Sequence, residues 1–119
     1  MSSQRVKKVE SVMRREISDV ITHELRDPRL VGVTVIDVVA APDLKRATVY
    51  YRIVDMHDET RKAAGEALGK AKSAVRKIVG DRMSMKYTPE IDFKYDATED
   101  KAQKIEDLLN TIKRDEESE

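Results

Sequence analysis

The sequence predicts an α+β domain in which helices cover one face of a small sheet, a two-layer architecture. Residues 5–26 and 58–80 place apolar side chains at the three- and four-residue steps of a helix face. Residues 31–40, 46–54 and 90–95 show β-branched runs or two-residue alternation instead. The predicted order is helix, strand, strand, bent helix, strand and a short C-terminal helix.

The first predicted helix, residues 5–26, has a clear apolar face and clear ends. Ser2 or Ser3 can cap its start with a side-chain oxygen. Pro28 ends it, because the residue before a proline avoids helical torsions. The apolar face consists of Val6, Val9, Met13, Ile17, Val20 and Ile21.

The two segments that follow predict an antiparallel hairpin. Residues 31–40 are rich in β-branched side chains, and residues 46–54 alternate between two faces. Between them, Pro42 fixes one backbone torsion and Asp43 can accept a bond from its own backbone, which is typical of a turn over residues 41–45.

The long helix predicted for residues 58–80 has an alanine-rich buried face and two interior glycines. Gly65 and Gly69 each cost about 1 kcal/mol relative to alanine, and Ser73 can bend a helix through its hydroxyl. We therefore expect a bend or break within residues 65–74. Asp58 is the expected cap at the start, and Gly80 the expected C-terminal stop.

The remaining elements are a third strand and a last helix. Apolar residues alternate through 83–95, but Pro89 cannot donate to a ladder, so the strand is expected at 90–95. A helix follows at 99–113, capped by Asp96 or Thr98. The chain of 119 residues suits one domain over 1–114, with residues 115–119 as an acidic disordered tail.

Composition excludes several classes of protein. There is no cysteine, so disulfides and thiolate-based zinc or redox sites are excluded. The sequence shows no secretory signal and no apolar run of about 18 residues, so no membrane partner is expected. The formal net charge is +0, yet the last five residues hold four acids and no base, which leaves +4 on residues 1–114. That asymmetry fits an RNA-associated protein, and a tail that only aids solubility fits equally well.

Catalytic constellations are absent from the sequence. His23-Glu24 resembles the start of a zinc-protease motif, but the second histidine would stand at position 27, where the residue is Asp27. His23 is better interpreted as a partly exposed helix residue. We predict no enzymatic activity, no cofactor, no metal and no small-molecule substrate.

Basic residues recur on three segments and predict contact with RNA phosphates. Helices project cations from a rigid frame, as phosphate recognition requires, although the same residues could simply be solubilising charges. The first helix offers Lys7, Lys8, Arg14 and Arg15; the long helix Lys70, Lys72, Arg76 and Lys77; and the next connection Arg82 and Lys86. The aromatic residues all lie in predicted strands, where core packing is favoured over base stacking: Tyr50, Tyr51, Tyr87, Phe93 and Tyr95.

Several segments, taken in order along the chain, resemble the motifs of one known family. The first helix leads into a leucine–x–aspartate–proline–x–leucine turn at residues 25–30. The hairpin from Val38 to Tyr50, the basic stretch from Ala71 to Arg76 and the proline–glutamate–aliphatic–x–phenylalanine strand over 89–93 follow. The last helix, around residues 104–109, is also similar. Together, over roughly residues 5–112, these segments resemble the ribosome-binding factor A family.

The resemblance implies a type II KH-like fold in which a helix–kink–helix replaces the usual glycine-rich loop. The kink would fall at Ala71-Lys72-Ser73, where serine stands in place of the family's usual glycine. Arg76 would then be the foremost residue for rRNA contact, with Ser73 beside it. The resemblance further implies binding to free small (30S) ribosomal subunits or their precursors, and help with late maturation and 5′-end processing of 16S rRNA, above all in the cold.

The absence of cysteine is compatible with a reducing cytoplasm, where we expect the protein, and a monomer is expected. A different function stays open, namely a protein–protein adaptor of similar fold that docks a partner without RNA. The near-zero net charge favours it slightly. Binding by an adaptor would be insensitive to salt, because few counterions would be released.

Overall fold

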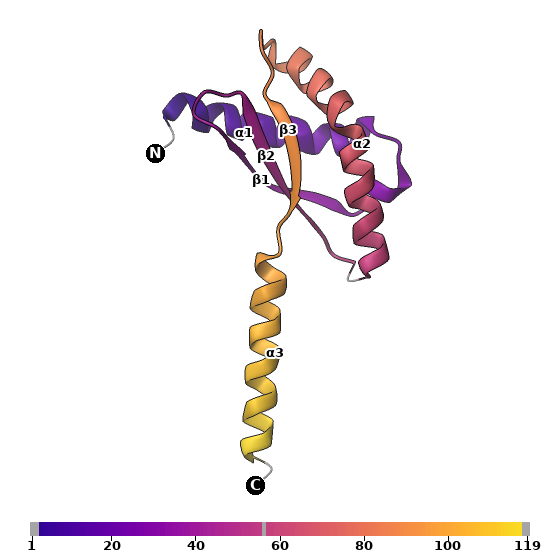
Figure 1. Ribbon diagram of the computed structural model, residues 1–119, viewed down its shortest axis with the longest axis vertical. Helices are drawn as coiled ribbons and strands as arrows, with labels where there is room; N and C mark the ends of the chain where they lie inside the picture. The colour runs from indigo at the N-terminus through magenta and orange to yellow at the C-terminus, as the bar shows by residue number, and fades with distance from the viewer. Residues whose placement is uncertain (1–2, 56, 118–119) are drawn as a thin grey trace.

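A computed structural model describes residues 3–55 and 57–117 as a mixed three-stranded sheet with helices on one face (Figure 1). The sheet order is β1-β2-β3. Strand β1 (Val33–Ala40) pairs antiparallel with β2 (Arg46–Ile53), with Val38 opposite Val49, and this confirms the predicted hairpin. Strand β3 (Glu90–Tyr95) pairs parallel with β2. The two-layer α+β prediction is therefore confirmed.

Helix α1 (Gln4–Asp19) starts where the sequence predicts and ends in an unusual way. The Ser3 hydroxyl accepts a hydrogen bond from the Val6 amide at 3.2 Å, which caps the helix. The last turn, η1 (Val20–Glu24), is a π-helix closed by the Leu25 amide bonding to the Val20 carbonyl at 3.0 Å. A 3-10 turn, η2 (Pro28–Leu30), follows and buries Leu30.

Helix α2 (Asp58–Met83) is one uninterrupted α-helix, so of the bend or break predicted within residues 65–74, the break does not occur. The ribbon curves along its length in Figure 1, which agrees with the bend. The expected ends are also wrong. His57 stands at the N-cap position without a side-chain cap, and the helix passes Gly80 to stop at Ser84, whose φ of 51° is left-handed.

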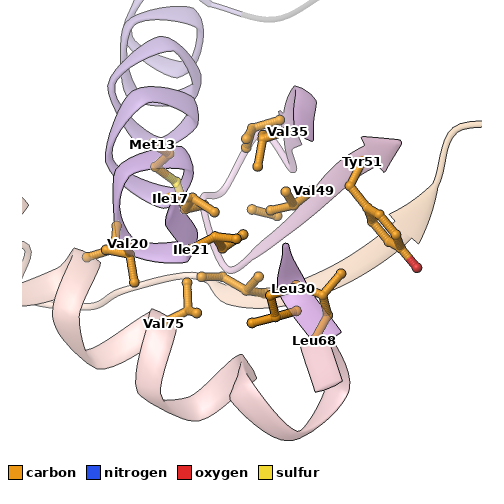
Figure 2. Close-up of a cluster of buried hydrophobic side chains, with 14 of the residues drawn as sticks. Met13, Ile17, Val20, Ile21, Leu30, Val35, Val49, Tyr51, Leu68 and Val75 are labelled. Atoms are coloured by element: carbon orange, nitrogen blue, oxygen red, sulfur yellow. The ribbon is translucent and has the colours of Figure 1, made fainter. Parts of the chain in front are cut away.

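The core lies between the sheet and helices α1 and α2 (Figure 2). Alternate strand residues point into it, and the apolar face of each helix covers them. Burying such side chains contributes about 1.5–3 kcal/mol each. The buried set includes Met13, Ile17, Val20, Ile21, Leu30, Val35, Val49, Tyr51, Leu68 and Val75.

Helix α3 (Thr98–Glu117) extends away from the two layers and buries none of its residues (Figure 1). Its base is tied to the sheet, because Asp100 accepts a bond from the Tyr95 hydroxyl at 3.0 Å and pairs with Arg61 at 3.1 Å. The Asp96 carboxylate accepts the Thr98 amide at 3.0 Å, as the capping prediction expected. Residues 115–117 are helical, so the disordered tail predicted there is wrong; 118–119 lie outside the described residues.

Candidate RNA-binding surface

The first part of the candidate surface is a groove where α2 runs beside the edge strand β3. We call it the α2–β3 groove. Lys72 Nζ lies 3.5 Å from Asp92 Oδ1, and Arg46 Nη2 lies 3.0 Å from Asp92 Oδ2. The Arg46 hydrogen bond, aided by the charge of Lys72, lowers the pKa of Asp92. The groove is lined by Arg46, Lys72, Ser73, Arg76, Glu90, Ile91 and Asp92.

Arg76 connects this groove to the loop that precedes β3. Its Nε and Nη2 donate to the Thr88 carbonyl at 3.1 and 2.8 Å. Two donors on one acceptor hold the loop backbone against the helix, while the side chain as a whole remains exposed. Arg76 can therefore support the loop and still present positive charge at the surface.

A second hollow continues along α2 past Arg76. It brings Ser73, Arg76 and Lys77 of the helix together with Lys86 of the loop, and Asp81 is its one carboxylate. Four of the predicted RNA-binding residues thus share one continuous stretch of surface with Lys72. Cations on a helix and an adjoining loop can follow a phosphate backbone, which is the geometry the sequence analysis expected.

Other predicted residues lie apart from this stretch. Lys70 sits one turn before Ser73 and lines a shallow hollow between α2 and η2. Hydrogen bonds from Arg29 lower the pKa of Asp27 in this hollow to about 2, and the charge of Lys70 contributes less. On α1, Lys7 and Lys8 are exposed. Arg14 and Arg15 line a separate hollow beside His23, and Arg15 Nε lies 3.7 Å from Glu16.

Arg82 is enclosed by carboxylates. Its Nη1 lies 2.6 Å from Asp19 and 3.2 Å from Glu16, and its Nη2 lies 3.0 Å from Glu24. The hydrogen bonds from Arg82 and then His23 lower the pKa of Asp19. Because three acids surround it, Arg82 ties the end of α2 to α1 and η1, and the surface described above does not depend on it.

Sequence reasoning missed three residues that border this surface. Arg5 precedes Lys7 and Lys8 on α1, and Arg46 follows Lys45 at the start of β2, but the sequence analysis singled out neither. The fold brings both to a hollow that Arg76 of α2 also lines. Tyr87 was expected in a strand and in the core, and this is wrong: it lies in the loop after α2 and is 78% exposed. Pro89, two residues later, had already moved the expected strand to 90–95, and this was the signal that Tyr87 lies outside it.

Neither a metal cluster nor a membrane span is found in the part of the chain that the structure describes. Within residues 3–55 and 57–117, no group of three or more histidines or acids is placed to hold a metal ion. His23 is exposed, with Nδ1 2.9 Å from Asp19 Oδ1. Over the same residues, none of the helices is both long enough and apolar enough to span a bilayer.

The comparisons with known proteins agree on one family. The model of the family described as "Ribosome-binding factor A" matches residues 5–109. The ribosome-binding factor A of Halothermothrix orenii is 38% identical over 118 residues, 99% of this chain and 96% of that protein. The crystal structure of the Thermus thermophilus factor superposes with a TM-score of 0.67 at 26% identity, covering 76% of this chain and 93% of that chain.

A further match shows the same fold in a complex. A homology model of the Thermus thermophilus factor, fitted into a cryo-EM map of a 30S–factor complex, superposes with a TM-score of 0.64 at 24% identity. It covers 76% of this chain and 93% of that chain. The fold is KH-like, as the resemblance implied. With a family match over most of its length, this chain belongs to the ribosome-binding factor A family.

Proposed function

We propose that this protein binds free small (30S) ribosomal subunits or their precursors and assists late maturation of 16S rRNA, including its 5′ end. It acts as a cytoplasmic monomer, by binding and rearranging RNA rather than by catalysis. The contact surface is the α2–β3 groove with its extension over Lys77 and Lys86.

One observation carries the assignment of the surface. Lys72, Arg76, Lys77 and Lys86 project from one helix and the loop pinned to it, so their spacing is set by rigid structure. Lys77 and Lys86 have no ion pair within the described part of the chain. The two hollows are lined by five cations and three acids, and this excess of positive charge favours a phosphate backbone as the ligand. The Thermus thermophilus relative fitted into a 30S complex supports the same partner.

A charge-reversal variant tests this surface. Lys72→Glu combined with Lys77→Glu alters two exposed side chains that do not pack in the core. Affinity for free small subunits at low salt should fall roughly tenfold or more. The variant makes fewer phosphate contacts, so its binding releases fewer counterions from the RNA. Co-sedimentation with purified free subunits gives the affinity.

The matched control is Lys62→Glu with Lys113→Glu. These two lysines are also exposed, and they lie on the first half of α2 and on α3, away from the groove. The control carries the same change in net charge and should bind nearly as tightly as the unaltered protein. If the control and the groove variant weaken binding equally, general charge and not this surface governs binding.

A protein–protein adaptor remains the second candidate because of one feature of α3. Ile105, Leu108, Leu109 and Ile112 follow one helix face and are 61, 61, 60 and 47% exposed. An apolar stripe of this kind is typical of a helix that packs on another protein. An adaptor would bind its partner with an affinity that barely changes with salt, and the groove variant would leave that affinity unaltered.

A further inference from the structure

A large cleft lies next to the α2–β3 groove, at the end of the molecule where three segments meet. It is bounded by the first turns of α1, the turn between β1 and β2, and the 83–88 segment that follows α2. Its volume is about 1180 Å³. That exceeds the roughly 300–1,000 Å³ of a small-molecule pocket, so an extended chain fits it better than a compact ligand. We call it the Tyr87 cleft.

The walls of the Tyr87 cleft combine apolar surface with an excess of positive charge. Its floor includes Val6, Val9 and Leu44, which pack against the core. Two acids also face it: Asp43, which accepts the Lys45 amide at 3.0 Å, and Glu90, 3.5 Å from Arg46. The cations on its rim are Arg5, Lys45, Arg46, Arg76 and Lys86. The chemistry of the walls suits a ligand that is both anionic and flat or apolar.

Tyr87 gives the cleft an exposed aromatic ring. Tyr87 is 78% exposed, so its ring does not gain the stabilisation that a buried aromatic side chain contributes to a core. The ammonium of Lys86 lies 5.6 Å from the ring centroid, a distance at which a cation is attracted to a π-face. A ring beside a cation is the pairing with which proteins stack a base and neutralise its phosphate.

The ring is displayed on a loop that is fixed on both sides. Before it, the Met85 amide donates to the Gly80 carbonyl at 3.1 Å. After it, the Thr88 carbonyl accepts both bonds from Arg76, and Pro89 is fully buried. The Glu90 amide then donates to the Lys45 carbonyl at 2.9 Å. A ring held in this way loses little freedom when a ligand binds, which favours a binding role over chance exposure.

We propose that the Tyr87 cleft binds one or two unpaired RNA nucleotides, with a base stacked on Tyr87 and the flanking phosphates beside Arg5 and Lys86. An unpaired nucleotide offers the flat base and the anionic backbone that these walls complement. This site rests on the rRNA-binding function proposed above, and it adds a preference for single-stranded over helical RNA.

Three forms of the full chain test the stacking step: the unaltered protein, Tyr87→Phe and Tyr87→Ala. Each is titrated with a fluorescently labelled single-stranded RNA of about eight nucleotides and with the same backbone carrying abasic riboses. Stacking on an aromatic ring is worth about 1–3 kcal/mol per base, so Tyr87→Ala should weaken binding of the intact RNA roughly tenfold. Tyr87→Phe keeps the ring and should stay within about twofold of the unaltered protein.

Abasic RNA separates stacking from charge. All three proteins should bind it equally and weakly, whereas Arg5→Glu should weaken both RNAs. As a position control, Tyr50→Ala removes a half-buried tyrosine from the open face of the sheet and should leave the affinity unchanged. Thermal unfolding checks that each variant is folded.

The outcomes are decisive in either direction. If Tyr87→Ala binds intact RNA with the same affinity as the unaltered protein, the Tyr87 cleft is not a nucleotide site. The same conclusion follows if the unaltered protein binds neither RNA. Either result leaves salt-sensitive binding to free subunits, and with it the proposed function, standing. Loss of that subunit binding in the unaltered protein would instead overturn the proposed function itself.

Discussion

At the scale of single residues, Gly80 shows how the loop that carries Tyr87 is held against α2. A Cβ at Gly80 would overlap the Thr88 hydroxyl, and Thr88 Cβ and Cγ2 would lie only 3.3 and 3.4 Å away. Rotating the threonine would move its hydroxyl but not its Cβ, so a tight contact would remain. The missing side chain allows the loop to approach the helix closely enough for Arg76 to reach the Thr88 carbonyl.

Gly80→Ala should destabilise the domain by about 1–3 kcal/mol, the usual cost of overpacking. Chemical denaturation measures the change in the free energy of unfolding. Gly69→Ala is the matched control, because a Cβ there meets no atom within 4 Å among the described residues. That substitution should stabilise the protein by about 0.5–1 kcal/mol, since alanine is the better helix former. A stabilised Gly80→Ala variant would contradict the close approach described above.

Residue identity predicted part of the candidate surface. The sequence identified Lys72, Ser73, Arg76, Lys77 and Lys86 as candidates, and the fold places them along one stretch of α2 and its loop. It could not separate Arg82 from them, because charge type does not reveal the three acids that surround it in space. The RNA-binding role of each residue stays a prediction.

At the scale of elements, the Arg82 cluster fastens the end of α2 to α1 and η1. Its guanidinium contacts Asp19 and Glu24, which lie far earlier in the chain. The side chain is 27% exposed, so water screens these pairs only in part. Through this cluster, the helix that carries the groove cations is held to the rest of the helical layer.

Arg82→Gln should lower the thermal midpoint, and the loss should depend on pH. Because folding lowers the pKa of Asp19 below 3.8, its bond to Arg82 stabilises the protein above about that pH and ceases to do so as pH falls below it. The difference in midpoint between the two proteins should thus be largest near neutral pH and shrink as the solution is acidified through the lowered pKa. Calorimetry over this range measures it.

Arg14→Gln serves as the control for that series, since Arg14 is an exposed arginine on α1 with no ion pair among residues 3–55 and 57–117. Its midpoint should follow that of the unaltered protein at every pH. A constant difference between Arg82→Gln and the unaltered protein would show that the side chain acts through packing and not through its charge.

Most elements followed from periodicity, and the exceptions have physical causes. Both hairpin strands and β3 lie where alternation and β-branching predicted. Of the bend or break expected in α2, the break did not occur. Gly65 instead serves packing, because a Cβ there would lie only 3.3 Å from the Tyr51 hydroxyl. The glycine thus allows the strand residue to approach the helix. Tertiary contacts outweigh intrinsic helix propensity in this segment.

At the scale of the whole molecule, the fold class and the antiparallel pairing of β1 with β2 were predictable, and the pairing of β3 was not. Helical and strand periods fixed the two layers. The parallel pairing of β3 with β2 depends on where α2 returns the chain, which local patterns do not encode. The position of α3 was equally hidden, since its amphipathic pattern predicts a partner and the described residues supply none that buries it.

The central claim is that this protein holds free small subunits through phosphate contacts made by one face of the molecule. Its most direct test is co-sedimentation with free small subunits and with intact ribosomes across a salt series. The expected result is retention on free subunits alone, with log affinity falling against log salt at a slope of about −3 to −5, as roughly four to six phosphate contacts require. Binding that is indifferent to salt, or equal on intact ribosomes, would contradict the claim.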